Sequence, residues 1–176
     1  FIVPVSFHGI NIPLQIPKNI LYDEITGVSL IHFFNKFKNN ISIIYNALLT
    51  EKRIIILGHN ERASIVCYMV LSLCLLISPT IKGILKKAYP YACLTAMQFL
   101  SVKGYIAGVT NPIFEQRQEW WDILLNIKTD EVKISENYRE TLDNNPLYNK
   151  VLTYDKTNLI NDIKNGINLN YSEEWV

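Results

Sequence analysis

One stretch, residues 53–81, restricts the possible folds more than any other part of the sequence. It begins with RIIIL, a short apolar run without alternation, which is typical of a β-strand covered on both faces. Gly58 ends the run, and 19 uncharged residues follow between Arg62 and Lys82. That length could cross a membrane as a helix. Pro79, three serines and the strand directly in front favour instead a helix buried in an α/β core, with no transmembrane span.

Helices and strands are expected to alternate around this stretch. Apolar residues recur at alternating steps of four and three from about Ser29 to Leu49, which predicts one long helix. Strands are expected at AYPYACL, GYIAGV and WWDILLNI, a helix at LTAMQFL, and a return strand at VKI after a KTDE turn. This order predicts an α/β fold with a mostly parallel central sheet, helices on both faces and an antiparallel edge hairpin.

The chain is expected to form a single lobe over residues 1–176, with a core at 1–134 and a polar extension at 135–176. Residues 1–17 should form short extended pieces about a turn at His8-Gly9. Short helices are expected near 157–165 and from Ser172, where a helix begins and is cut off. The net charge of +1 gives no sign of nucleic-acid binding. The three cysteines are widely spaced in apolar surroundings and predict reduced thiols.

The stretch GYIAGVTNP, residues 104–112, combines two glycines with an Asn-Pro exit from the sheet. As a strand it would place Gly104, Ile106 and Gly108 on one face, so that a helix could lie close against the sheet. Asn111 precedes Pro112 and is therefore held extended where the chain leaves the sheet. Because open α/β sheets bind their ligands at the carboxyl ends of the strands, this exit is a candidate binding surface.

The adjacent tryptophans are expected to differ in exposure. If WWDILLNI is a strand, Trp121 shares a face with Ile123, Leu125 and Ile127 and should be buried. Trp120 would lie on the other face with Asp122. There it could be a partly exposed anchor for a partner, or it could pack under the loop at 114–118.

Candidate sites for covalent chemistry are weak. The turn at Gly58–Ser64 follows a strand and could hold a phosphate, but it has one glycine and neither a G-x-G-x-x-G pattern nor a Lys-Ser/Thr pair. The sequence contains no G-x-S-x-G nucleophile elbow. His8 and His32 have no cysteine or carboxylate at ligand spacing, so we expect no metal and no cofactor.

Four segments in this order, LLTEKRIIILG, YPYACL, GYIAGVTNPIFE and EWWDILLNI, resemble the central lobe (cDENN, or C-lobe) of DENN-domain proteins. The likeness is to the polarity-axis-stabilisation (SPA) branch, whose members interact with an Arf-class GTPase. The resemblance implies an α/β lobe that works beside an N-terminal longin-like lobe. It also implies a small GTPase of the Rab or Arf class as partner, often with guanine-nucleotide exchange activity, in vesicle trafficking or cell polarity.

The resemblance implies no covalent catalysis, and a cytoplasmic location, with membranes reached through the partner. The candidate binding surface at the exit from the sheet and the possible anchor at Trp120 lie close together in the sequence. We therefore expect the partner to contact Asn111, Glu115, Trp120 and Asp122. Two alternatives stay open at this point. One is a small doubly wound enzyme that binds a phosphate-containing ligand at Gly58–Ser64, and the other is a scaffold lobe that binds the GTPase without exchange activity.

Overall fold

The computed structural model describes residues 2–7, 10–15, 28–77 and 83–144. Strands β1 (Ile2–Phe7) and β2 (Ile10–Gln15) pair antiparallel, which confirms the predicted extended pieces about residues 8 and 9. The described part of the α/β lobe begins at Val28.

A five-stranded sheet in the order β4-β5-β3-β6-β7 forms the centre of the lobe. The first four strands in this order run parallel, and β7 pairs antiparallel with β6. The predicted α/β fold and its antiparallel edge hairpin are therefore confirmed. The strands are β3 (Ile54–Leu57), β4 (Ala88–Tyr89), β5 (Ile106–Val109), β6 (Ile123–Asn126) and β7 (Glu131–Ile134).

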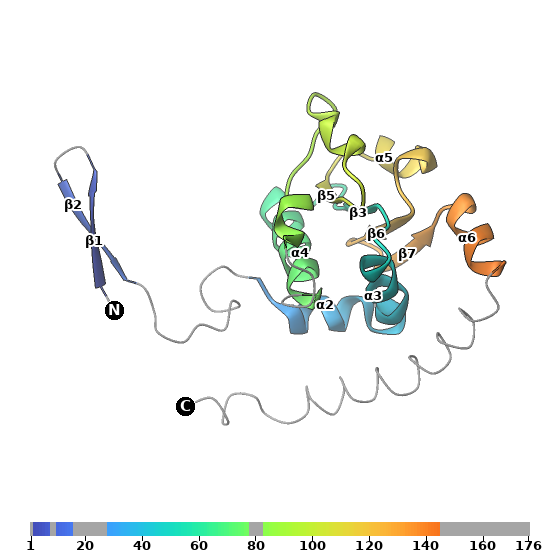
Figure 1. Ribbon diagram of the computed structural model, residues 1–176, viewed down its shortest axis with the longest axis horizontal. Helices are drawn as coiled ribbons and strands as arrows, with labels where there is room; N and C mark the ends of the chain where they lie inside the picture. Colours follow the sequence, from blue (N-terminus) through green and yellow to red (C-terminus); the bar gives the residue numbers. More distant parts are fainter. Residues whose placement is uncertain (1, 8–9, 16–27, 78–82, 145–176) are drawn as a thin grey trace, which may run out of the picture.

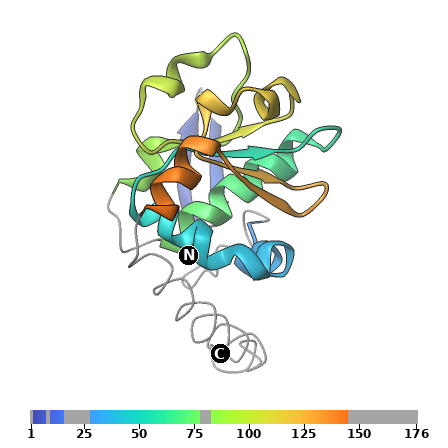
Figure 2. The same ribbon diagram turned by 90° about the vertical axis from the view of Figure 1, so that its right-hand side faces the viewer.

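Three helices cover one face of this sheet: α2 (Leu30–Phe37), α3 (Ile41–Leu49) and α4 (Ala63–Ile77) (Figures 1 and 2). The predicted helix over 29–49 is wrong in its continuity, because a 3-10 turn at Lys38–Asn40 separates α2 from α3. Asn40 leaves the helical region, with φ −116° and ψ 5°. Asparagine has a low helix propensity, and the break still leaves the apolar faces of both helices in the core.

The residues of α4 between Val66 and Ile77 that face the sheet are fully buried. In the described part of the chain no helix has both the length and the apolarity needed to cross a membrane. The long apolar stretch forms instead the central helix of the core, as expected from the strand that precedes it. Pro79, its predicted end, lies outside the described residues.

The opposite face of the sheet carries shorter pieces: η3 (Met97–Ser101), α5 (Ile113–Gln116) and η4 (Gln118–Trp120). The strand predicted at 88–94 is only two residues long, and the helix predicted at 94–100 is a 3-10 turn. Pro90 cannot donate to the ladder, so regular pairing ends there. One further bond, from the Ala92 N–H to the Gly108 carbonyl at 2.7 Å, keeps the chain beside β5.

Helix α4 approaches the sheet closely at two glycines. A Cβ on Gly108 would lie 2.3 Å from the Pro90 carbonyl oxygen and 2.7 Å from a methyl group of Val66. A Cβ on Gly58 would lie 2.4 Å from the other methyl group of Val66. The prediction that glycine acts as a packing device is therefore confirmed for Gly108. The predicted packing against a helix is wrong for Gly104, which has φ +67° and packs closely against Glu51 in a left-handed turn.

The two tryptophans also depart from the predicted strand faces. Trp121 is buried as expected, with 2% exposure, but it packs with Leu124 in the core beneath α5. Ile123 and Leu125 belong to the core on the α4 side. The regular strand begins only at Ile123, so alternation cannot be extended back to Trp121.

After β7 the chain forms α6 (Glu136–Asp143). Ser135 caps this helix, because its hydroxyl accepts a hydrogen bond from the Tyr138 N–H at 3.4 Å. Tyr138 is buried against the helical side of the core. The helices predicted near 157–165 and from Ser172 lie outside the described residues, and the single lobe over 1–176 stays a prediction.

Substituting Gly108 tests the close approach of α4. We expect Gly108→Ala to lower the free energy of unfolding by about 3 kcal/mol, because the new methyl group meets a backbone carbonyl that cannot move aside. Gly83→Ala is the matched control. A Cβ at Gly83 has no atom within 4 Å, and only its φ of +79° opposes alanine, at about 1 kcal/mol. Urea unfolding measures both, and equal losses would contradict the close contact.

Candidate partner-binding surface

At the amino-terminal edge of the sheet, an ion pair between Arg53 before β3 and Asp122 before β6 joins these two strands. The Arg53 guanidinium donates to both carboxylate oxygens, with Nη2 to Oδ1 at 2.8 Å and Nε to Oδ2 at 3.2 Å. The Arg53 backbone N–H also donates to Oδ2 at 2.8 Å, and Nη1 donates to the Glu119 carbonyl at 2.6 Å. This bidentate arrangement uses most of the hydrogen-bonding capacity of the carboxylate.

Burial and pairing act in opposite directions on Asp122, whose side chain is 17% exposed. Burial by itself raises the pKa of this carboxyl group, but the hydrogen bonds and positive charge of Arg53 outweigh it and bring the pKa below its ordinary value. Next to the pair, the Tyr105 hydroxyl donates to the Trp120 carbonyl, and burial raises the pKa of this phenol. Because its partners are internal, Asp122 stabilises the edge of the sheet.

Two further predicted contact residues, Glu115 and Trp120, lie on the segment that crosses from β5 to β6. Glu115 pairs with Lys133 of β7 at 2.6 Å. Trp120 is half-buried, with its ring 5.3 Å from that of Phe114 and the Arg117 guanidinium 5.9 Å from its centre. The packing of Trp120 against Phe114 agrees with the alternative that it packs under the 114–118 loop. Partner binding by Glu115, Trp120 and Asp122 stays a prediction.

The carboxyl-terminal edge of the sheet has a different character, since several of its side chains are exposed to solvent. Parallel pairing brings the residues after β3, β4 and β5 together there. We call this surface the rim. None of the six residues that define it is Lys, Arg, Asp or Glu, and Glu61 and Arg62 follow Asn60 in the same turn. The rim comprises His59, Asn60, Tyr91, Leu94, Thr110 and Asn111.

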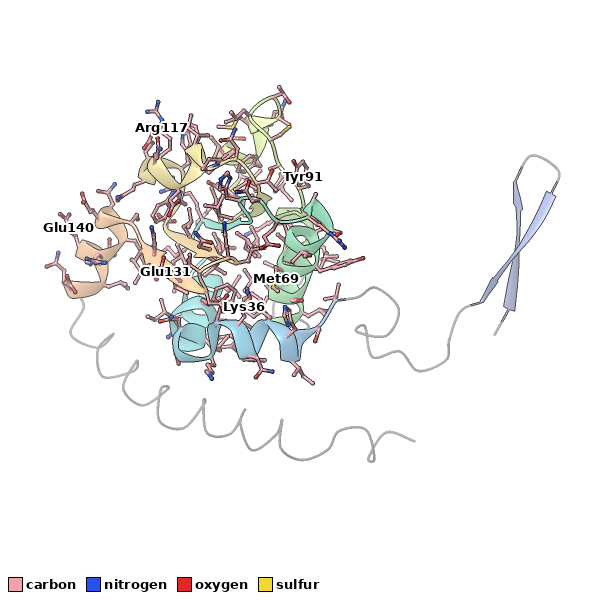
Figure 3. All side chains as sticks on the ribbon, turned by 180° about the vertical axis from the view of Figure 1, so that it is seen from behind. Lys36, Met69, Tyr91, Arg117, Glu131 and Glu140 are labelled. Carbon is pink, nitrogen blue, oxygen red and sulfur yellow. The ribbon has the colours of Figure 1, made fainter. Side chains whose placement is uncertain are left out.

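Tyr91 and Leu94 are the large apolar side chains of the rim, 51% and 42% exposed. Figure 3 shows Tyr91 at the outside of the lobe. Its hydroxyl lies 3.2 Å from Thr110 Oγ1, so the ring is held beside the exit of β5. Asn111 is exposed, and its Oδ1 accepts a hydrogen bond from the Ile113 N–H at 3.0 Å, which starts the turn into α5. Hence Asn111 is at the rim, whereas Asp122 lies at the opposite edge.

The predictions from sequence did not include Tyr91 and Leu94. Both fall within AYPYACL, which the sequence assigns to a strand. The available signal was Pro90, because a proline ends regular pairing and turns the following aromatic residue away from the sheet.

The turn at Gly58–Ser64 has a packing role that explains its glycine. Replacing the Gly58 hydrogen with a methyl group would cause clashes with Val66 and with Ile127, at 2.4 and 2.9 Å. Glu61 in the same turn adds negative charge close to where a phosphate would sit. Among the described residues no three histidine, cysteine or acidic side chains are grouped so that they could hold a metal ion.

The three cysteines are free thiols, as predicted. Burial raises the pKa of Cys74 to about 12, so this thiol is neutral at physiological pH and packs as a core residue. Cys93, half-buried near the rim, has a lowered pKa because the Thr95 hydroxyl hydrogen-bonds to it at 3.0 Å.

Comparison with known proteins places residues 27–136 in a family described as stabilization of polarity axis. The chain is 33% identical over 119 residues to an AFI1-like protein of Schizosaccharomyces pombe. The aligned region covers 63% of this chain and 19% of that protein. It is 32% identical over 106 residues to DENN domain-containing protein 11 of Xenopus laevis. That aligned region covers 55% of this chain and 24% of that protein. The chain thus spans about a fifth to a quarter of these relatives.

Removing the charge of Asp122 tests the internal role of this carboxylate. We expect Asp122→Asn to lower the free energy of unfolding by about 2–3 kcal/mol at neutral pH, because Arg53 loses its partner in a partly buried site. Asp130→Asn is the matched control. Asp130 is 50% exposed in its pair with Lys36, so its loss should cost less than about 1 kcal/mol.

The pH dependence gives a second readout for Asp122. Its folded-state pKa is lowered, so its contribution is complete above the unfolded-state pKa of about 3.9 and is lost as the pH falls through the folded-state value. The stability difference between the wild type and Asp122→Asn should therefore narrow below about pH 4. A difference that stays constant across the acid range would show that the Asp122 charge is not what stabilises this edge.

Proposed function

The chain belongs to the stabilization-of-polarity-axis family, and from this premise we propose that it is the central lobe of a DENN-type module that binds a small GTPase. The partner is of the Rab or Arf class, and the setting is cell polarity and membrane traffic. The similarity to a DENN domain-containing protein supports the DENN assignment. An N-terminal longin-like lobe of the same protein completes the module.

The rim is the surface that supports GTPase binding best, and its exposed Tyr91 is the single observation that carries the proposal. Protein interfaces are enriched in tyrosine and depleted of charged residues at their centres. Tyr91 and Leu94 supply apolar contact area, while Asn60, Thr110 and Asn111 supply neutral hydrogen-bonding groups around them. A rim held on parallel strands also keeps its shape, which lowers the cost of ordering it on binding.

Exchange of guanine nucleotide on such a surface needs no covalent step. A lobe that binds the nucleotide-free GTPase more tightly than the GDP-bound form must, by linkage, weaken GDP binding by the same factor. In the complete module the rim would thus promote GDP release through differential affinity, without a cofactor or metal. The module acts in the cytoplasm and reaches membranes through its GTPase.

The second form of this function is a scaffold lobe, which binds the GTPase without promoting nucleotide exchange. The two forms differ in one measurable quantity, the rate at which GDP leaves the bound GTPase. In a scaffold lobe the GTPase binds at the rim with equal affinity in both nucleotide states, so that GDP release is unchanged.

Capture of small GTPases tests the proposal. The chain, and its full-length parent, are immobilised and exposed to a panel of nucleotide-free and GDP-loaded Rab and Arf proteins. We expect one or more members to bind, and Tyr91→Ala to weaken that binding by at least tenfold, because an interface anchor is worth roughly 2 kcal/mol or more. Asn111→Ala should have a smaller effect in the same direction.

Tyr68→Ala is the matched control, since Tyr68 is 39% exposed on α4 and lies outside the rim. It should bind the GTPase as the wild type does. Equal losses from Tyr68→Ala and Tyr91→Ala, with both variants folded by circular dichroism, would place the contact elsewhere. Capture of no GTPase by the parent protein would overturn the function itself.

A further inference from the structure

We propose that a second surface of the lobe, at the amino-terminal ends of β4 and β5, contacts anionic lipid membranes directly. We call it the basic tip. It consists of the turn Gly83–Lys87 together with Lys103 and Glu51. This proposal does not depend on the GTPase, because it is carried by different residues and a different kind of contact.

Leu85 is the most exposed of the large hydrophobic side chains in the described residues, at 65%. It lies on a single 3-10 turn that the chain enters through Gly83 in a left-handed conformation, and the Lys86 N–H closes the turn on the Gly83 carbonyl at 2.9 Å. Neighbouring Ile84 is 7% exposed and packs into the core. The turn is therefore anchored by one side chain and presents the next outward.

Three lysines belong to the same surface as this exposed leucine. Lys86 and Lys87 follow it directly, and Lys103 comes from the loop before β5. Lys87 and Lys103 share the carboxylate of Glu51, with Nζ to Oε1 at 2.6 Å and Nζ to Oε2 at 3.1 Å. Three lysines against one glutamate leave a net charge of +2, and Lys103 remains 83% exposed.

The three segments are held together by close packing as well as by charge. A Cβ on Gly104 would lie 2.9 Å from Cβ of Glu51, so only glycine lets the 103–104 loop approach the turn that carries Glu51. Glu51 itself has φ 52°, in the left-handed region. Lys87 and Lys103 consequently come from separate parts of the chain but meet at Glu51.

An exposed apolar side chain on the same turn as a cluster of lysines matches the chemistry of an anionic bilayer. Leucine can enter the boundary between headgroups and acyl chains while the lysine ammonium groups contact lipid phosphates. An acidic peptide would engage the lysines but leaves the outward leucine without an apolar partner. We therefore commit to the lipid surface as the occupant of the basic tip.

The expected contact is weak by itself. One leucine and a net charge of +2 give less membrane affinity than a lipid anchor, so the basic tip would orient a lobe that another signal has brought to the membrane. Vesicle binding must accordingly be measured at low ionic strength and high lipid concentration, because the electrostatic contribution is screened by salt.

Vesicle co-sedimentation tests the proposal, using the chain with vesicles of phosphatidylcholine mixed with phosphatidylserine or of phosphatidylcholine alone. We expect binding to the anionic vesicles only, and its loss when salt is added. Lys86→Gln and Lys103→Gln should each weaken binding by about fivefold. Leu85→Ser should weaken it by about tenfold, without loss of thermal stability because the side chain is already exposed.

Lys128→Gln is the matched control, because Lys128 is an exposed lysine in the turn between β6 and β7. It should bind vesicles as the wild type does, and all four variants should retain GTPase capture by the rim. No binding of the wild type to anionic vesicles would overturn the proposal. So would equal weakening by Lys128→Gln, or retention on polyglutamate without vesicle binding, which would assign the basic tip to an acidic protein.

Discussion

The close approach of α4 to the sheet is the contact on which the rest of the lobe depends. Val66 places its two methyl groups where Gly58 and Gly108 carry no side chain, so one residue of the helix fits against two neighbouring strands. Any larger residue at either glycine would lift the helix from β3 and β5 and open the most buried part of the core. This contact also fixes the ends of both strands, from which the chain turns into the rim.

The two edges of the sheet differ in how their polar side chains are satisfied. At the amino-terminal ends of β3 and β6, the charged groups of Arg53 and Asp122 are satisfied internally, whereas the basic tip before β4 and β5 keeps exposed lysines. At the carboxyl-terminal edge, Tyr91 and Asn111 have local hydrogen bonds that orient them but remain exposed to solvent. A charged group already paired inside the protein gives little to a partner, whereas an oriented and exposed neutral group is available for one.

The sequence predicts the buried strand, the central helix and the edge hairpin, because each depends on a local apolar pattern that the core then satisfies. It does not predict the break at Asn40, nor that the buried Trp121 packs in the core beneath α5 and not with Ile123 and Leu125, because both follow from packing between distant segments. In the candidate site, too, features set by a local pattern can be predicted from the sequence and contacts between distant residues cannot. Asn111 could be placed from the Asn-Pro exit of a strand, but the ion pair of Asp122 with Arg53 joins residues 69 positions apart. No local sequence pattern predicts an ion pair between residues so far apart.

Hydrogen–deuterium exchange of the lobe, with and without its nucleotide-free GTPase, tests the role of the rim most directly. Slower exchange in the presence of the GTPase is expected at residues 90–96 and 110–113, where the backbone around Tyr91 and Asn111 would be covered. Exchange in α6 should not change, because that helix lies beside β7, away from the rim (Figure 1). Protection confined to α6 or to the amino-terminal edge around Arg53, with no change at the rim, would contradict the account.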